Sequence, residues 1–125
     1  MSIHDFLILA FLFQLKHFVC DFLLQGPYMF MNKGTYGHPG GILHSAVQVL
    51  GTVVILALFG VTFWPTLLLS LLEGVIHYHI DWVKMNINTR FGLNPNKSQF
   101  WYLLGADQLL HQATYLILIG SVSLI

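Results

Sequence analysis

Charged residues are scarce in this sequence. Only 8% of its 125 residues are Asp, Glu, Lys or Arg, whereas 56% are hydrophobic. A typical soluble domain carries roughly 25% charged residues. A soluble protein of this composition would have too few charges to cover its surface, so we expect a membrane protein.

Two further absences narrow the possible classes. There is a single cysteine, Cys20, which excludes an intrachain disulfide framework. The formal net charge is zero, so nothing indicates a nucleic-acid partner.

The apolar runs predict one transmembrane domain over residues 1–125. A spanning helix needs roughly 20 mostly apolar residues, and clusters of glycine, proline and asparagine divide the chain into four such segments. We therefore expect an all-α integral membrane bundle of four transmembrane helices, covering about residues 3–25, 41–59, 66–85 and 99–125.

The few basic residues predict the orientation. Lys33 lies in the first connection, and Arg90 and Lys97 lie in the third, with Lys84 at its edge. Lysine and arginine favour the cytoplasmic side of a membrane. We expect an integral protein of the bacterial inner membrane, with these two connections in the cytoplasm and both termini outside.

Three histidine–carboxylate pairs constrain the function most. The members of each pair are four residues apart, so on a helix both side chains point to the same face. The pairs are His17/Asp21, His77/Asp81 and Asp107/His111, and a lone histidine, His44, opens the second helix. Because successive helices alternate in direction, all seven side chains are expected near the cytoplasmic end. Ionisable groups inside a bilayer are costly and indicate a functional site.

Imidazole and carboxylate together indicate a metal site. They are the usual nitrogen and oxygen ligands of zinc, manganese and iron. Seven groups exceed the four ligands of a tetrahedral ion, so we expect one or two divalent transition-metal ions, with zinc favoured. The remaining groups would orient the ligands. Hydrogen bonds between membrane helices are the alternative for any single pair.

Other polar residues extend the same helix faces. Glu73 precedes His77 by four residues, and we expect the general base to be Glu73 or an aspartate that does not bind metal. Lys16 lies well inside the first helix, where it either snorkels to the interface or pairs with a carboxylate. Four residues are expected to orient a substrate: Gln25, Lys33, Lys84 and Gln108.

The ordered motifs resemble a family of small bacterial and phage integral membrane proteins, catalogued as a domain of unknown function. The motifs are His17-x-x-x-Asp21-Phe22-x-x-Gln25, then Lys33, His44, His77-x-x-x-Asp81-x-x-Lys84 and Asp107-Gln108-x-x-His111. The resemblance covers nearly the whole chain and implies a compact helical membrane domain, without supplying an activity. More distantly, the chain is similar to membrane-embedded metal-dependent hydrolases. These include ceramidase-like enzymes and a group with a His-Ser pair on a helix, like His44-Ser45.

Three functions are compatible with these patterns. We favour a metal-dependent hydrolase that acts on a membrane lipid, or on a lipid-linked or membrane-partitioned substrate, from the cytoplasmic leaflet. The second is a divalent-cation or proton transporter or channel. The third is a non-catalytic membrane interaction module with a structural metal. Four helices are few for transport unless the chain forms a homo-oligomer, which stays open.

Overall fold

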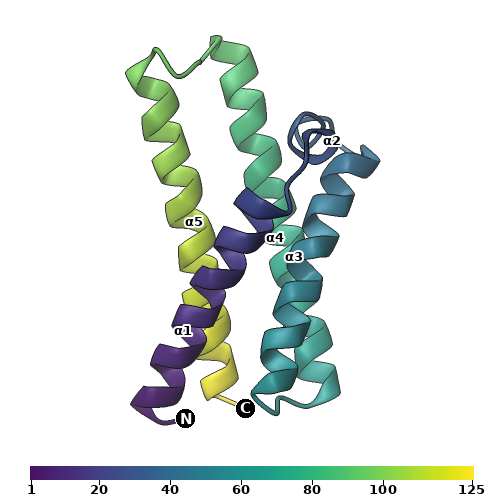
Figure 1. Ribbon diagram of the computed structural model, residues 1–125, viewed down its shortest axis with the longest axis vertical. Coiled ribbons are helices and arrows are strands. Elements are labelled where there is room, and N and C mark those ends of the chain that lie inside the picture. The colour runs from purple at the N-terminus through teal and green to yellow at the C-terminus, as the bar shows by residue number, and fades with distance from the viewer.

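The computed structural model describes all 125 residues and contains helices without any strand. The elements, in chain order, are α1 (Ile3–Phe18), the π-helical turn η1 (Val19–Leu23), α2 (Pro27–Phe30), α3 (Pro39–Leu58), α4 (Phe63–Phe91) and α5 (Ser98–Ser123) (Figure 1). The predicted all-α class is confirmed. The short α2 lies in the connection after the first long helix.

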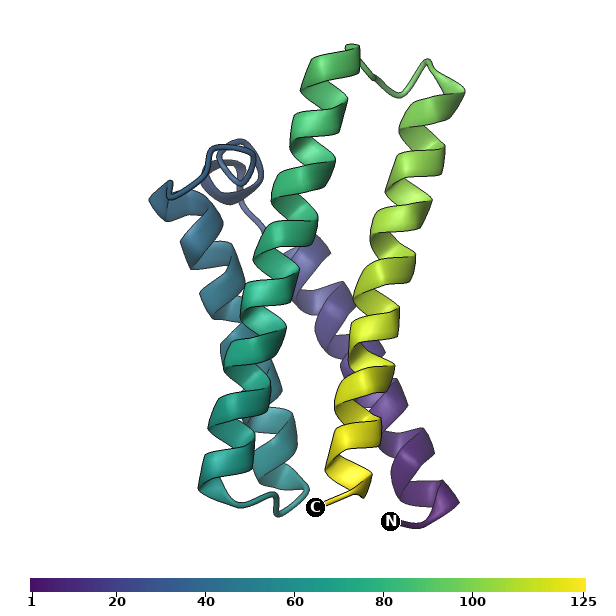
Figure 2. The ribbon, with the colours of Figure 1, turned by 180° about the vertical axis from the view of Figure 1, so that it is seen from behind.

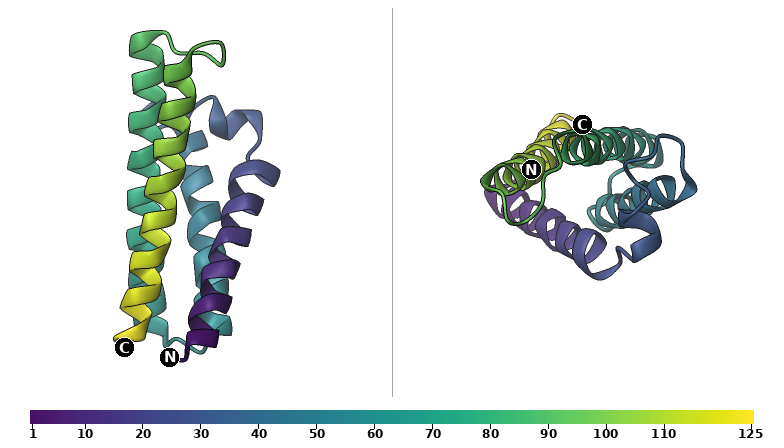
Figure 3. Two further views of the ribbon diagram at one scale, coloured as in Figure 1. Left: turned by 90° about the vertical axis from the view of Figure 1, so that its left-hand side faces the viewer. Right: turned by 90° about the horizontal axis from the view of Figure 1, so that it is seen from above.

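The four long helices run up and down around a common axis. Both termini lie at one end of the bundle, and α2 and the α4–α5 turn lie at the other (Figures 1 and 2). The α4–α5 hairpin extends beyond the other helices at that second end. In the view along the axis, the four helices surround the centre on all sides (Figure 3).

Local sequence signals explain several helix ends. Ser2 and Asp5 form a reciprocal capping box at the start of α1. Pro39 occupies the first turn of α3, and His38 accepts a hydrogen bond from Gly40 N–H. The helix expected to end near residue 85 continues to Phe91. Gly92 then ends it in the left-handed conformation at φ 57°.

The first helix ends in the π-helical turn η1. Leu24 N–H donates to the carbonyl of Val19, five residues earlier, so one extra residue is accommodated in the turn. Cys20 and Asp21 are the buried residues of this turn. The π turn therefore directs the Asp21 carboxylate inward at the level of the other predicted ligands.

Polar residues dominate the interior. Of 27 buried residues, 16 are polar or charged and only eight are hydrophobic. The apolar core sits toward the end of the bundle where the termini lie, formed by Leu9, Phe13, Ile55, Leu56, Tyr115, Leu118 and Ile119. Large apolar side chains meanwhile cover much of the outer surface. This distribution is the reverse of that in a soluble protein.

Two helical segments are long and apolar enough to cross a membrane. They are Ile3–Leu23, which comprises α1 and η1, and Pro39–Leu58, which is α3. α3 and α4 approach closely at Gly74, where a Cβ atom would clash with Cγ2 of Val49. The missing side chain of Gly74 lets the two helices pack closely at this point.

Candidate metal centre

All seven predicted ligands are buried, and none exposes more than 9% of its surface. Every long helix contributes. His17 comes from α1, Asp21 from η1, His44 from α3, His77 and Asp81 from α4, and Asp107 and His111 from α5. We call these seven side chains the His/Asp cluster.

Three ligand atoms form a nearly equilateral triangle at its centre. Nε2 of His44 lies 3.1 Å from Nε2 of His77. Oδ2 of Asp81 lies 3.2 Å from the first and 3.1 Å from the second. Ligands that share one tetrahedral ion with bonds of about 2.0–2.1 Å are about 3.3 Å apart. The three atoms already have nearly the spacing that a common ion requires.

Asp21 and His111 flank this triangle on either side. Oδ1 of Asp21 lies 3.1 Å from Nε2 of His44 and 3.6 Å from Nε2 of His77. Nε2 of His111 lies 3.3 Å from Oδ1 of Asp81, and its ring stacks on that of His77 with centroids 4.1 Å apart. Two triplets with close ligand atoms result, Asp21–His44–His77 and His77–Asp81–His111. Each can hold a metal ion.

The centre contains buried polar atoms without hydrogen bonds. Oδ2 of Asp81 lies near three nitrogens, yet none of them has the geometry to donate to it. Nδ1 of both His44 and His77 is also unpartnered. If those Nδ1 atoms carry the ring protons, both Nε2 lone pairs face the triangle. Buried polar atoms normally find partners, and a cation in the triangle would supply one for Oδ2 of Asp81.

His17 lies in neither triplet, because protein groups occupy both of its ring nitrogens. Nδ1 lies 2.9 Å from the Tyr115 hydroxyl and 3.2 Å from Oδ2 of Asp21. Nε2 pairs with Oε1 of Gln108. Gln48 Nε2 donates to the other Asp21 oxygen at 2.6 Å. These contacts fix the orientation of the Asp21 carboxylate.

Gln48 and Tyr115 lie on the polar helix faces that the sequence predicts, and both contact the cluster. Each follows a predicted ligand by four residues, His44 and His111 respectively, which places it on the same helix face. That spacing is the signal that identifies them as neighbours of the cluster.

Asp107 also lies outside both triplets. Its Oδ1 is 3.2 Å from Nε2 of His111. Its Oδ2 accepts hydrogen bonds from Lys84 Nζ at 3.1 Å and from Gln108 Nε2 at 3.0 Å. Asp107 thus links the cluster to two of the residues expected to orient a substrate.

The other two, Gln25 and Lys33, close the cluster at the end opposite the termini. Lys33 Nζ donates to Oε1 of Gln25 at 2.9 Å and lies 3.5 Å from Oδ2 of Asp81. Although it is a lysine, Lys33 exposes only 7% of its surface. All four expected substrate residues therefore contact the cluster or one another.

Glu73 belongs to a separate group, which we call the Lys16–Glu73 pair. Lys16 Nζ lies 2.8 Å from Oε1 of Glu73, and the Thr52 hydroxyl donates to Oε2 at 3.1 Å. Of the two alternatives for Lys16, the structure shows pairing with a carboxylate. Gly51 makes room for it, since a Cβ atom there would lie 2.9 Å from Cγ of Lys16. Glu73 has no hydrogen bond or ion pair with the His/Asp cluster.

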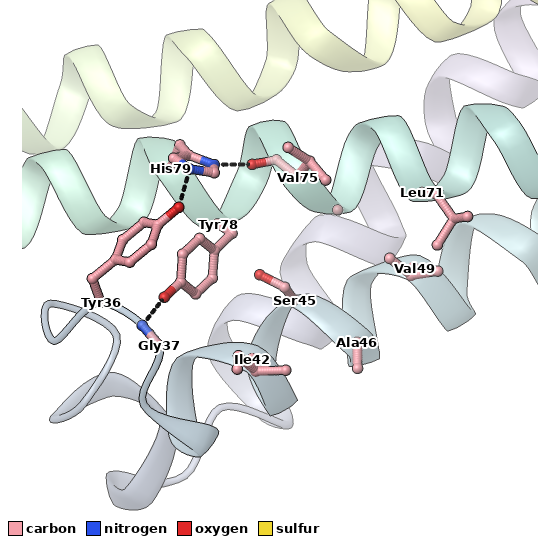
Figure 4. A pocket seen from close by; sticks show the side chains of 11 residues that line it. Tyr36, Gly37, Ile42, Ser45, Ala46, Val49, Leu71, Val75, Tyr78 and His79 are labelled. Carbon is pink, nitrogen blue, oxygen red and sulfur yellow. Dashed lines mark hydrogen bonds between the residues drawn. The ribbon is translucent and has the colours of Figure 1, made fainter.

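Ser45, the neighbour of His44, faces a different part of the molecule. It lines a largely apolar groove of about 410 Å³ between α3 and α4 (Figure 4). At one end of this groove Tyr36 bonds His79, and Gly37 N–H donates to the Tyr78 hydroxyl. The hydroxyl of Ser45 has no hydrogen-bond partner. The His-Ser dipeptide therefore does not place both side chains in one site.

Comparison with known proteins supports the resemblance seen in the motifs. No curated protein and no solved structure matches the chain. Residues 8–124, which contain every member of the His/Asp cluster, match the family described as "Protein of unknown function (DUF3307)", and the chain belongs to this family.

Proposed function

We propose that this protein binds one or two divalent transition-metal ions inside the membrane. The triangle of His44 Nε2, His77 Nε2 and Asp81 Oδ2, with sides of 3.1–3.2 Å, carries the proposal. The unpartnered Asp81 oxygen supports it. Mixed imidazole and carboxylate ligands in a compact set favour zinc.

The charge balance of the cluster supports a cation. Apart from the histidines, the cations that pair with the cluster aspartates are Lys33 and Lys84. With neutral histidines, one negative charge is left over. An uncompensated charge in a low-dielectric interior is costly. A bound divalent ion would offset it and leave the cluster with one net positive charge.

We also propose that α4 and α5 cross the membrane with α1 and α3. Their ionisable residues lower their hydropathy, but Glu73, Asp81 and Asp107 are at most 3% exposed and face the bundle. Their outer faces carry side chains such as Leu68 and Ile117, which are more than 60% exposed. The 29 residues of α4 span about 44 Å at 1.5 Å per residue, which exceeds the hydrocarbon core.

The basic residues support an orientation in the bacterial inner membrane. Lys33, Arg90 and Lys97 all lie at or near the end of the bundle that holds α2 and the α4–α5 turn. This end would face the cytoplasm, and both termini would lie outside. The His/Asp cluster would then lie beneath the cytoplasmic surface.

The chemistry we assign to this site is hydrolysis of a lipid-linked or membrane-partitioned substrate. His44, His77 and Asp81 would hold a divalent ion, which would supply Lewis-acid chemistry for the bond to be cleaved and for a water molecule. Asp107, which is not a member of either triplet, would accept a proton from water. The hydroxyl of that water joins the acyl or phosphoryl centre, and the proton passes to the leaving oxygen. Glu73 has no hydrogen bond or ion pair with the His/Asp cluster, whereas Asp107 contacts His111 of one triplet, so we favour Asp107 as the base.

The apolar core argues against a continuous ion pathway. A transporter of cations or protons needs a route from the cluster to the opposite face. Toward the termini the bundle interior is filled by side chains that expose at most 1% of their surface, namely Leu9, Phe13, Leu56, Leu118 and Ile119. This closely packed apolar region favours a hydrolase, or a protein with a structural metal, over a channel.

Metal analysis tests the metal site directly. Protein purified in detergent without chelator should contain about one or more transition-metal ions per chain. Asp81→Asn and His111→Ala should lose the metal. His4→Ala should retain it, since His4 is exposed at the opposite end of the bundle. Wild-type protein free of bound metal would overturn the proposal.

A liposome assay separates hydrolysis from transport. Protein would be reconstituted into vesicles that enclose a fluorescent chelator, and lipid products would be followed by mass spectrometry. We expect hydrolysis products without cation influx, and Asp107→Asn should stop product formation while keeping the metal. Influx with intact lipids would instead support a transporter.

A further inference from the structure

A pocket of about 470 Å³ adjoins the His/Asp cluster, and its lining comes from α2, the second half of α4, the α4–α5 connection and the start of α5. Lys33 and Lys84, both of which contact cluster aspartates, lie in its wall together with Gln25 and Asn88. Apolar residues, including Phe30 and Phe100, form the rest of its lining. We call it the lysine pocket.

The polar residues of the lysine pocket have hydrogen-bonding capacity to spare. An ammonium group has three N–H donors. Lys84 uses one of them, on Asp107, and Lys33 uses one on Gln25 and lies 3.5 Å from Asp81. The amide oxygen of Asn88 is buried without a partner. An amide can present either its oxygen or its nitrogen at such a position, so Asn88 can offer a further donor.

We propose that the lysine pocket binds a phosphate-class anion, and that it does so when the cluster holds a divalent metal. This inference rests on the metal site proposed above. Lys33, Lys84 and Asn88 line the same pocket, and N–H donors of this kind suit the oxygens of such an anion. The apolar wall of Phe30 and Phe100 suits the chain of an amphiphile that carries it. The substrate class is therefore an anionic lipid or another membrane-partitioned phosphate.

The dependence on metal follows from the charges. With neutral histidines and no metal, the cluster carries one excess negative charge, and both lysines pair with aspartates. An anion would then be repelled. A divalent ion reverses the net charge and engages Asp81, so Lys33 is free to turn its ammonium toward the pocket. By linkage, the anion must strengthen metal binding by the same factor as the metal strengthens anion binding.

The test measures zinc affinity by calorimetric titration of the full chain in nanodiscs. One set contains phosphatidylcholine alone, and the other contains added phosphatidic acid. A third arm adds inorganic phosphate to the phosphatidylcholine discs. We expect phosphatidic acid to tighten zinc binding about tenfold. Inorganic phosphate should reproduce the effect only if a free anion suffices, so this arm distinguishes a lipid headgroup from a soluble source.

Lysine variants distinguish pocket binding from the general attraction of zinc to an anionic membrane. For Lys33→Gln and Lys84→Gln, zinc affinity with phosphatidic acid is compared with that of the same variant in phosphatidylcholine discs. Both should lose the gain from phosphatidic acid. Lys97→Gln is the matched control, because Lys97 donates only to the Gly92 carbonyl in the α4–α5 connection and should keep the full gain.

Each outcome is decisive. Zinc binding that neither form of phosphate strengthens overturns the lysine pocket as an anion site and leaves the metal site standing. A gain that survives in both Lys33→Gln and Lys84→Gln also overturns it. Wild-type protein that binds no zinc, manganese or iron overturns both proposals together.

Discussion

Two buried groups of ionisable side chains lie in this bundle. They differ in their charge balance and in how many of their polar atoms have hydrogen-bond partners. In the Lys16–Glu73 pair one cation meets one anion, and each carboxylate oxygen accepts a bond from Lys16 or Thr52. In the His/Asp cluster three aspartates exceed two lysines, and Asp81 Oδ2 accepts no hydrogen bond at all.

This contrast indicates a different role for each group. A neutral, fully bonded group needs no further component, so its contribution is to hold α1, α3 and α4 together. A group with surplus charge and free lone pairs would be stabilised by an additional cation. Burial therefore does not distinguish the two groups, whereas their unequal charge balance and hydrogen bonding do.

The largest loss of unfolding free energy is expected when the Lys16–Glu73 pair is broken. Glu73→Gln leaves the Lys16 ammonium buried without its counter-ion, and the loss should be roughly 3–5 kcal/mol of unfolding free energy. Denaturation in mixed detergent micelles measures it. Zinc stoichiometry of the folded fraction should stay at the wild-type value. Loss of zinc from correctly folded Glu73→Gln protein would show that the two groups act as one.

A smaller effect is expected from the layer around the cluster. His17→Gln removes the imidazole that contacts Asp21, Tyr115 and Gln108. Disturbing a group that orients a metal ligand typically weakens binding 10–100-fold, so we expect about a tenfold loss of zinc affinity in competition with a fluorescent chelator. His79→Gln is the control, because His79 bonds Tyr36 and the Val75 carbonyl outside the cluster (Figure 4). Equal losses in both variants would mean that His17 has no special link to the metal.

Helix periodicity predicted which side chains form the cluster, but not that Glu73 belongs to a separate pair. Spacing of four residues places His77 with Asp81, and Asp107 with His111, on common faces, and the structure brings these pairs together. The same rule grouped Glu73 with His77. Its actual partner, Lys16, is 57 residues away. That pairing depends on the rotation of α1 against α4 and on the space that Gly51 leaves, neither of which periodicity contains.

Two backbone features also could not be predicted from the sequence. The π turn η1 contains neither glycine nor proline, so nothing in its composition distinguishes it from regular helix, although it sets the direction of Asp21. The polar residues after Met85 favoured a loop. Helix α4 instead continues to Gly92, where Leu93 N–H donates to the carbonyl of Asn88 and closes the end.

The smallest change in unfolding free energy is expected when both members of the Lys16–Glu73 pair are replaced together. Lys16→Met with Glu73→Leu replaces both charges by apolar side chains of similar length, and such exchanges of a buried ion pair are often neutral or stabilising. The Thr52 hydroxyl can then bond to a carbonyl of its own helix. We expect the double variant to unfold within about 1 kcal/mol of the wild type, and so to reverse most of the loss in Glu73→Gln. Its zinc content should equal that of the wild type, because no atom of the triangle is altered. A double variant that is stable but metal-free would place Glu73 in the metal site after all, and would return the general-base assignment from Asp107 to Glu73.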